Sequence, residues 1–349
     1  MRRHEHTGSH VRQILGLLAL IGAPAALTLW AVQPRPGPGY DAHDPTPYGY
    51  TISLTLFAIP VAVMLAQLVW RAATPVHRHA LIAASAVMAL VGFVLDLFFG
   101  ESFFTFYNRG ATLEWHLPAW SFAEWRWVPS YLPIEEFAFY ILGGLFLLTL
   151  YVWIEERWLR DDEMEARIEH ARNLPRLVHV HWTALLLWLA AIAAGFLYKR
   201  FVAQEPGIPG YFLFIMIIGV LPTVLFLHAV ERFVNWRAFA QAFAVLLLVE
   251  LLWEATLGVP FDWWNYKEAQ MLGIRVAAWS DLPIEAILLW VVVAWDCIVA
   301  YEICRVFLHM DGHEHPRSVR ERLFGSAPDS SPSAPPSSYG ASGRRKIES

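Results

Sequence analysis

The chain has 349 residues, of which 56% are hydrophobic and only 16% are charged. Soluble domains carry charge on about a quarter of their residues, so this composition excludes an ordinary soluble domain and indicates a membrane protein. The formal net charge of -5 provides no basic surface for nucleic acid. We therefore expect the lipid bilayer, and no nucleic acid, as a partner.

About eight apolar stretches reach the roughly 20 residues that a spanning helix needs. They lie near residues 13–32, 50–70, 80–99, 133–154, 180–198, 211–230, 238–257 and 283–304. The alternation of apolar and polar residues that marks a membrane β-barrel is not visible in them. The sequence therefore predicts an all-α integral membrane protein with about eight transmembrane helices.

If all these stretches span the membrane, most of the 26 Lys and Arg residues lie on the same side of the membrane as the N-terminus. This asymmetry predicts a multi-pass protein of the cell inner membrane with both termini cytoplasmic. The first stretch also fits a signal peptide, because a basic start precedes Ala23-Pro24-Ala25. Its apolar run continues past Ala25, which favours a retained helix.

Two copies of one short sequence motif begin two of the apolar stretches. Pro133-Ile134-Glu135-Glu136 and Pro283-Ile284-Glu285 each follow a long aromatic loop, and Asp96 and Glu254 fall at matched positions upstream of them. This pattern predicts two parallel three-helix repeats. The expected segments are an extra helix and outer loop (1–49), the first repeat (50–155), a cytoplasmic connector with a linking helix (156–210), the second repeat (211–308) and a disordered cytoplasmic tail (309–349).

Ionisable groups inside a membrane are functional candidates. Several carboxylates in a region of low dielectric constant cannot all stay ionised, so we expect some to be protonated near neutral pH. A protonated buried carboxyl is a general acid, and an alkene in the bilayer would be its matching substrate. A Pro followed by Glu is also an ordinary helix start, and Asp96 and Glu254 also fit a role as buried hydrogen-bond partners. Asp296, deeper in the last stretch, is expected to be a packing partner or a half-buried counter-ion.

The loops at 100–132 and 258–282 are dense in aromatic residues. Interfacial belts explain most of the 17 Trp residues. Aromatic faces next to the acids would also stabilise a carbocation. The expected substrate contacts are Trp127, Tyr131, Trp264 and Trp279. No metal or nucleotide motif is visible, so we expect no metal and no cofactor.

The segment from Leu132 to Phe139, with the aromatic loop before it, resembles the motif of the small integral-membrane carotenoid cyclases. These are the heterodimeric-type lycopene cyclases, which occur as two three-helix subunits or as one fused chain. Leu282-Pro283-Ile284-Glu285 resembles the same motif, and the resemblance extends over residues 50–308. It implies acid-initiated, redox-neutral cyclisation of the linear end group of a carotenoid or other isoprenoid lipid. Ala286 departs from the pattern, because the first motif has Glu136 at that place, so we expect unequal halves.

The resemblance places Glu135, Glu136 and Glu285 at the acidic positions of that family. We expect Glu135 or Glu136 to be the general acid that protonates the alkene. Glu285, with Asp96 or Glu254, would stabilise the cation or accept the proton released on ring closure.

A second hypothesis is a non-catalytic membrane transporter or scaffold whose carboxylates bind a cation or a proton. Pro60 and Pro222 favour it, because they interrupt two matched stretches and transporters use broken helices near the midplane. As protein partners, the sequence is compatible with a second copy of the chain in a homo-oligomer or with other enzymes of the carotenoid pathway.

Overall fold

The computed structural model describes residues 47–72, 75–169, 177–205 and 207–311, with a few isolated helical residues between 16 and 27. Seven helices in these ranges are long and apolar enough to cross a membrane. They are Gly49–Trp70, Pro75–Phe103, Ile134–Arg157, Trp182–Phe201, Gly210–Val230, Trp236–Gly258 and Ile284–His309. The protein is therefore helical and membrane-embedded. The predicted helix at 13–32 and the predicted tail lie almost entirely outside the described residues.

Several spans contain a stretch of wider, π-helical winding. The helical elements are α2 (Gly49–Gln67) with η1 (Leu68–Ala72), α3 (Pro75–Phe103), α4 (Ile134–Arg157), α5 (Asp162–Glu169), α6 (Trp182–Phe201), α7 (Gly210–Phe214) with η3 (Ile215–Val220) and α8 (Leu221–Val230), α9 (Trp236–Trp253) with η4 (Glu254–Gly258), and α10 (Ile284–Asp311). The stretches η1, η3 and η4 are π-helical. Such windings are rare and are often found at functional sites.

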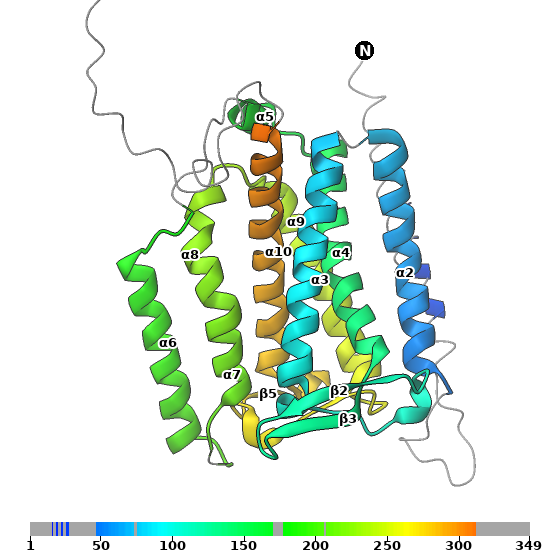
Figure 1. Cartoon of the computed structure of the whole chain (residues 1–349), viewed down its shortest axis with the longest axis vertical. Coiled ribbons are helices and arrows are strands. Elements are labelled where there is room, and N and C mark those ends of the chain that lie inside the picture. Colours follow the sequence, from blue (N-terminus) through cyan, green and yellow to red (C-terminus); the bar gives the residue numbers. More distant parts are fainter. Residues whose placement is uncertain are drawn as a thin grey trace, which may run out of the picture.

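The helices form one bundle around α4 and α10 (Figure 1). α4 contacts α2, α3, α9 and α10, and α10 also contacts α3, α8 and α9. In the most apolar stretch of each helix, 67% of the residues of α4 are buried inside the protein, compared with only 11% of those of α6. α6 therefore lies at the edge of the bundle, beside α8, and its apolar surface is left for lipid.

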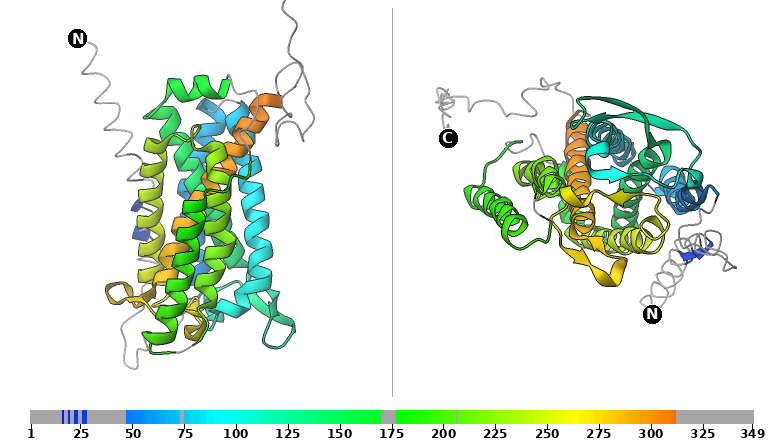
Figure 2. Two further views of the ribbon diagram at one scale, coloured as in Figure 1. Left: turned by 90° about the vertical axis from the view of Figure 1, so that its left-hand side faces the viewer. Right: turned by 90° about the horizontal axis from the view of Figure 1, so that it is seen from below.

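Short strands cover one end of the bundle, which we call the loop end (Figure 2). β2 (His116–Ser121) and β3 (Arg126–Pro133) form a hairpin, β5 (Arg275–Val276) pairs with β6 (Leu282–Pro283), and β1 (Phe104–Thr105) pairs with β4 (Asn265–Tyr266), all antiparallel. The short 3-10 turns η2 (Arg109–Ala111), η5 (Glu268–Gln270) and η6 (Ala277–Trp279) complete this end. The helical class predicted for the spans is confirmed, and the short strands of the loops are an addition that the sequence did not predict.

The start of α4 shows how these strands position a helix. Pro133 has an extended backbone, with φ -66° and ψ 146°, and it ends β3 directly before the helix. The amide of Ile134 donates to the carbonyl of Trp115 at 2.9 Å. The amide of Ile284 makes the same kind of bond to the carbonyl of Ile274 at 3.0 Å, at the start of α10. Each helix therefore begins where a strand pair ends.

Candidate functional site

The structure buries the predicted acids at the loop end of the bundle. Asp96, Glu135, Glu136, Glu254 and Glu285 are each at most 6% exposed. Glu136 interacts electrostatically with Glu254, Glu135 and Asp96. Glu285 instead has Lys199 and Arg275 as its charged neighbours. The bundle thus brings the predicted acids together at this end, and Glu285 shares Tyr211 as a neighbour with Asp96, Glu136 and Glu254.

Glu136 is held by two phenols. Tyr50, at the start of α2, donates to its Oε2 at 3.0 Å, and Tyr140, one turn along α4, is a second hydrogen-bond partner. Tyr50 itself is fully buried and stacks on Trp263 with ring centroids 5.4 Å apart. The carboxyl group of Glu136 is therefore fixed by donors from two helices.

Glu135 and Glu285 tie the loops to the helix starts. Glu135 Oε1 accepts from the hydroxyl of Thr51 at 2.6 Å and from the amide of Leu113 at 2.7 Å. Glu285 Oε1 accepts from the amide of Leu272 in the same manner. These bonds fit a structural role instead of a catalytic one, in which the Pro-Ile-Glu motif starts a helix and anchors the preceding loop.

Glu254 has both oxygens engaged. The indole of Trp290 donates to Oε1 and the phenol of Tyr266 donates to Oε2, each at 2.7 Å. Tyr266 lies in the loop between α9 and α10, and its burial, with the charge of Glu254, raises the pKa of the phenol well above its ordinary value of 10.0. Glu254 is therefore built into a fixed network of donors.

Aromatic side chains fill the space between Glu136 and Glu254. Their ring centroids lie between 4.9 and 6.5 Å from those of their neighbours in the cluster. The cluster consists of Tyr50, Phe139, Trp253, Trp263, Trp264 and Trp290. These rings pack as a core, so this part of the site is closed.

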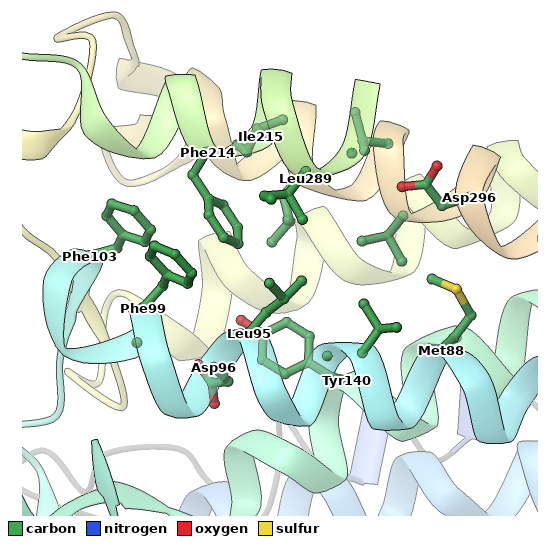
Figure 3. Close-up of a pocket in the computed structure, with 18 of the residues that line it drawn as sticks. Met88, Leu95, Asp96, Phe99, Phe103, Tyr140, Phe214, Ile215, Leu289 and Asp296 are labelled. Atoms are coloured by element: carbon green, nitrogen blue, oxygen red, sulfur yellow. The ribbon is translucent and has the colours of Figure 1, made fainter. Parts of the chain in front are cut away.

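Asp96 is part of the wall of an open cleft, and its carboxyl group lies on the opposite side of α3 from Leu95 and Phe99 (Figure 3). The cleft is a cavity of about 140 Å³ between α3, η3 and α10, with Tyr140 and Gly144 of α4 in its wall. Val91 and Ile218 line it and are 44% and 36% exposed, so the cleft reaches the lipid-facing surface of the bundle. An apolar cavity of this size takes a ligand as large as a benzene ring.

The carboxyl group of Asp96 is buried in the wall of this cleft, and its Oδ2 has no hydrogen-bond partner among the described residues. Gly100, one turn further along α3, makes room for it: a Cβ at Gly100 would lie 2.7 Å from Asp96 Oδ1 and 2.8 Å from Leu132 Cδ2. A buried polar atom without a partner is costly, and such atoms often mark a functional site.

The aromatic residues predicted as substrate contacts separate into two groups. Trp264 is 3% exposed and belongs to the closed cluster, and Tyr131 donates to the carbonyl of Phe104 at 2.7 Å. Burial raises the pKa of Tyr131. Trp127 and Trp279 are 44% and 40% exposed, and Trp127 packs on Phe98 and Trp120 at the surface. The structure does not bring these two tryptophans to the acids.

The cleft is lined by residues that sequence reasoning did not select. They are Phe99, Phe103, Tyr140, Tyr211 and Phe214, with Gly92 and Gly144. The hydroxyl of Tyr211 is buried without a partner among the described residues. Their common signal is weak: aromatic and small residues on helices are usual in any membrane bundle.

A second polar cluster lies at the other end of the bundle. Arg305 of α10 is 2% exposed and bridges Glu155 at 2.9 Å and Glu302 at 3.5 Å. Tyr151 donates to Glu302 at 2.7 Å. This network joins α4 to α10 away from the cleft. In the described part of the chain, His, Cys, Asp and Glu form no group of three or more that could hold a metal ion.

In comparisons with family models, curated proteins and solved structures, nothing matched this chain.

Proposed function

We propose that this protein is a membrane carotenoid cyclase of the lycopene cyclase type. It would close the linear end group of an isoprenoid by acid-initiated cyclisation without a change of oxidation state. The observation that carries the proposal is the cleft: an apolar cavity reaches the lipid-facing surface and has a buried carboxyl group, Asp96, in its wall. A lipid-borne alkene could enter from the bilayer and meet a proton donor out of contact with water.

Asp96 is the better candidate for the group that touches the substrate. Asp96 is among the residues that line the cleft, whereas Glu136 is not and only hydrogen-bonds Tyr140, which does line it. We therefore assign the role of general acid to Asp96 instead of to Glu135 or Glu136 of the Pro-Ile-Glu-Glu motif. Glu136 would modulate Asp96 by its charge, because the two groups interact electrostatically.

The reaction would proceed in three bond changes. Protonation of the terminal alkene by Asp96 forms a C–H bond and leaves a tertiary carbocation. The next alkene attacks that carbon, forming the ring bond and moving the positive charge into the ring. Loss of a proton from a neighbouring carbon restores a double bond. The faces of Tyr140, Tyr211, Phe99 and Phe214 around the cleft would stabilise the cation by cation–π attraction.

The other predicted acids would have supporting roles. Glu135 and Glu285 hold backbone amides of the loops, and Glu254 accepts from Trp290 and Tyr266. These contacts would keep the loop end closed above the site and exclude water, which would otherwise convert the cation into an alcohol. Glu254 would be the counterpart of Asp96 in a half that no longer carries out the chemistry.

We also propose that the two halves are parallel repeats. Leu113 and Leu272 make equivalent bonds to Glu135 and Glu285, and β1 pairs with β4, its counterpart in the second half. The contact of α3 with α10 likewise has a counterpart in the contact of α9 with α4. The boundaries would be 50–155 and 211–308. The loop end would face outward from the cell inner membrane, with both termini in the cytoplasm.

One observation favours the transporter hypothesis. The π-helical stretch η3 lies directly before Pro222 in the middle of a span and lines the cleft. Interrupted helices of this kind form ion and substrate sites in transporters. Proton- or cation-driven uptake by the purified protein in vesicles, together with unchanged pigments in cells, would favour this alternative.

Pigment analysis in a lycopene-accumulating host tests the proposal. The wild-type chain should convert the linear pigment into a ring-containing isomer. Asp96→Asn, which keeps the size of the side chain, should lower the rate roughly 10²-fold or more, as is typical for loss of a general acid. Glu101→Gln is the matched control, because Glu101 pairs with Lys267 at 2.8 Å and does not line the cleft. Only linear pigment with the wild-type chain, or wild-type rates with Asp96→Asn at equal membrane levels, would overturn it.

A further inference from the structure

A second carboxyl group lines the cleft and has no role in the scheme so far. Asp296 belongs to α10, whereas Asp96 belongs to α3, and apolar side chains such as Leu95 and Leu289 lie around the space between them (Figure 3). The sequence predicts Asp296 as a packing partner or a half-buried counter-ion. Among the described residues, it has no ion-pair partner.

The orientation of Asp296 is set by one hydrogen bond. The hydroxyl of Thr223, from α8, donates to Oδ1 at 2.6 Å. The other oxygen, Oδ2, lies beside Gly219 of η3, 3.5 Å from the place where a Cβ would stand. Because glycine has no side chain, nothing from this position covers Oδ2, and Val292 packs into the space where the side chain would stand.

The position of Asp296 lowers the stability of the fold. A carboxyl group within a membrane span costs free energy, and Thr223 satisfies only one of its two oxygens. Val292 and Val293, which also line the cleft beside it, offer no donor. A group retained at such a cost in a ligand-sized cleft is a functional candidate.

We propose that Asp296 is the base that removes the proton from the cyclised cation. This inference rests on the proposed cyclase function. Asp96 gives its proton to the terminal alkene carbon, and ring closure places the positive charge in the ring. Asp296 Oδ2 then takes a hydrogen from the carbon next to the cationic carbon, and the electron pair of that C–H bond becomes the ring double bond.

Atoms and charge balance in this reaction. One alkene is consumed, one C–C bond is formed, and the product is an isomer of the substrate. Asp296 releases its proton to water and Asp96 takes one up before the next turnover, so no other reactant is needed. The acid and the base belong to different helices, α3 and α10, that line the same cleft.

The place of the base decides which hydrogen is lost, and therefore where the ring double bond forms. Asp296 would thus determine the ring type as well as complete the reaction. Thr223 would be a positioning residue, since it touches the carboxyl group and orients Oδ2 towards the cleft.

The ratio of ring products tests this role, because it does not depend on how much protein reaches the membrane. Asp296→Asn should still start cyclisation. The ratio of the wild-type ring product to the other products should fall at least about 10-fold. The other products are ring isomers and the ring alcohol that forms when water captures the cation. Thr223→Val, which keeps the carboxyl group, should shift the ratio in the same direction by less. Asp281→Asn, an exposed loop position, is the control and should give wild-type products.

Each outcome decides the matter. Wild-type product ratios with Asp296→Asn would overturn the assignment while leaving the cyclase proposal intact. Complete inactivity of a well-expressed Asp296→Asn protein, equal to that of Asp96→Asn, would also overturn it, because initiation should not need the base. If Asp296→Asn does not reach the membrane, an unchanged ratio with Thr223→Val overturns it. If the wild-type chain forms no rings at all, the cyclase proposal fails and this role fails with it.

Discussion

Gly100 makes the geometry of the site testable without changing any acid. A methyl group at Gly100 would stand 2.7 Å from Asp96 Oδ1, whereas ordinary contact begins at 3.4 Å, so the carboxyl group must move by about 0.7 Å. Gly92, about two turns earlier on α3, is the matched control. A methyl group there would have Tyr140 Cβ at 3.9 Å as its nearest neighbour, which is ordinary contact.

The two substitutions share the same gain in helix propensity. Replacing glycine by alanine within a helix stabilises it by roughly 0.5–1 kcal/mol. At Gly100 this gain is opposed by overpacking, which costs about 1–3 kcal/mol. Gly100→Ala should therefore lower the free energy of unfolding by roughly 1 kcal/mol, whereas Gly92→Ala should raise it slightly. Displacement of a catalytic group by close to 1 Å lowers the rate by up to about 10²-fold.

The assay compares cyclisation rates in membranes that contain equal amounts of each variant, together with thermal unfolding in detergent. Gly100→Ala should cyclise roughly 10- to 10²-fold more slowly than the wild type. Gly92 lines the cleft, so Gly92→Ala is the control for stability and not for the rate. A wild-type rate and wild-type stability for Gly100→Ala would refute the conclusion that Asp96 must hold this position.

Two further predictions concern the rest of the bundle. Arg305→Met removes a fully buried cation and leaves Glu155 and Glu302 without compensation, so it should lower the free energy of unfolding by about 3–5 kcal/mol, measured by denaturant titration. The raised pKa values of Tyr131 and Tyr266 mean that the folded protein holds these protons more tightly than the unfolded chain. The stability that these two phenols contribute should therefore be constant below the unfolded value of 10.0 and fall as the pH rises above it, and Tyr266→Phe should weaken this alkaline loss in a thermal-unfolding series.

The spans could be predicted from the sequence because each depends on one local property, a run of about 20 apolar residues. The starts of α4 and α10 were also visible, since Pro at the first turn followed by Glu is a local signal. The strands at the loop end were missed because their pairing joins distant segments. β1 and β4, for example, place Phe104 opposite Tyr266.

The acids could be predicted as candidates, but their roles could not. Glu135 and Asp96 are both buried carboxyl groups, yet one accepts from Thr51 and a loop amide, and the other lines an open cleft. That difference depends on tertiary contacts and on small residues such as Gly100 and Gly144, which leave space beside it. The partners of Glu136 and Glu254, Tyr50 and Trp290, come from other helices, and no sequence spacing indicates them.

The most direct test of acid-initiated, redox-neutral cyclisation is the mass of the product formed by the purified protein in D₂O. In H₂O the product should have the mass of the linear substrate. In D₂O it should carry one additional deuterium for each ring, delivered by an exchanged carboxyl group, without consumption of a reductant. A product that differs from the substrate by two hydrogens, or rings formed without deuterium, would contradict the proposed mechanism.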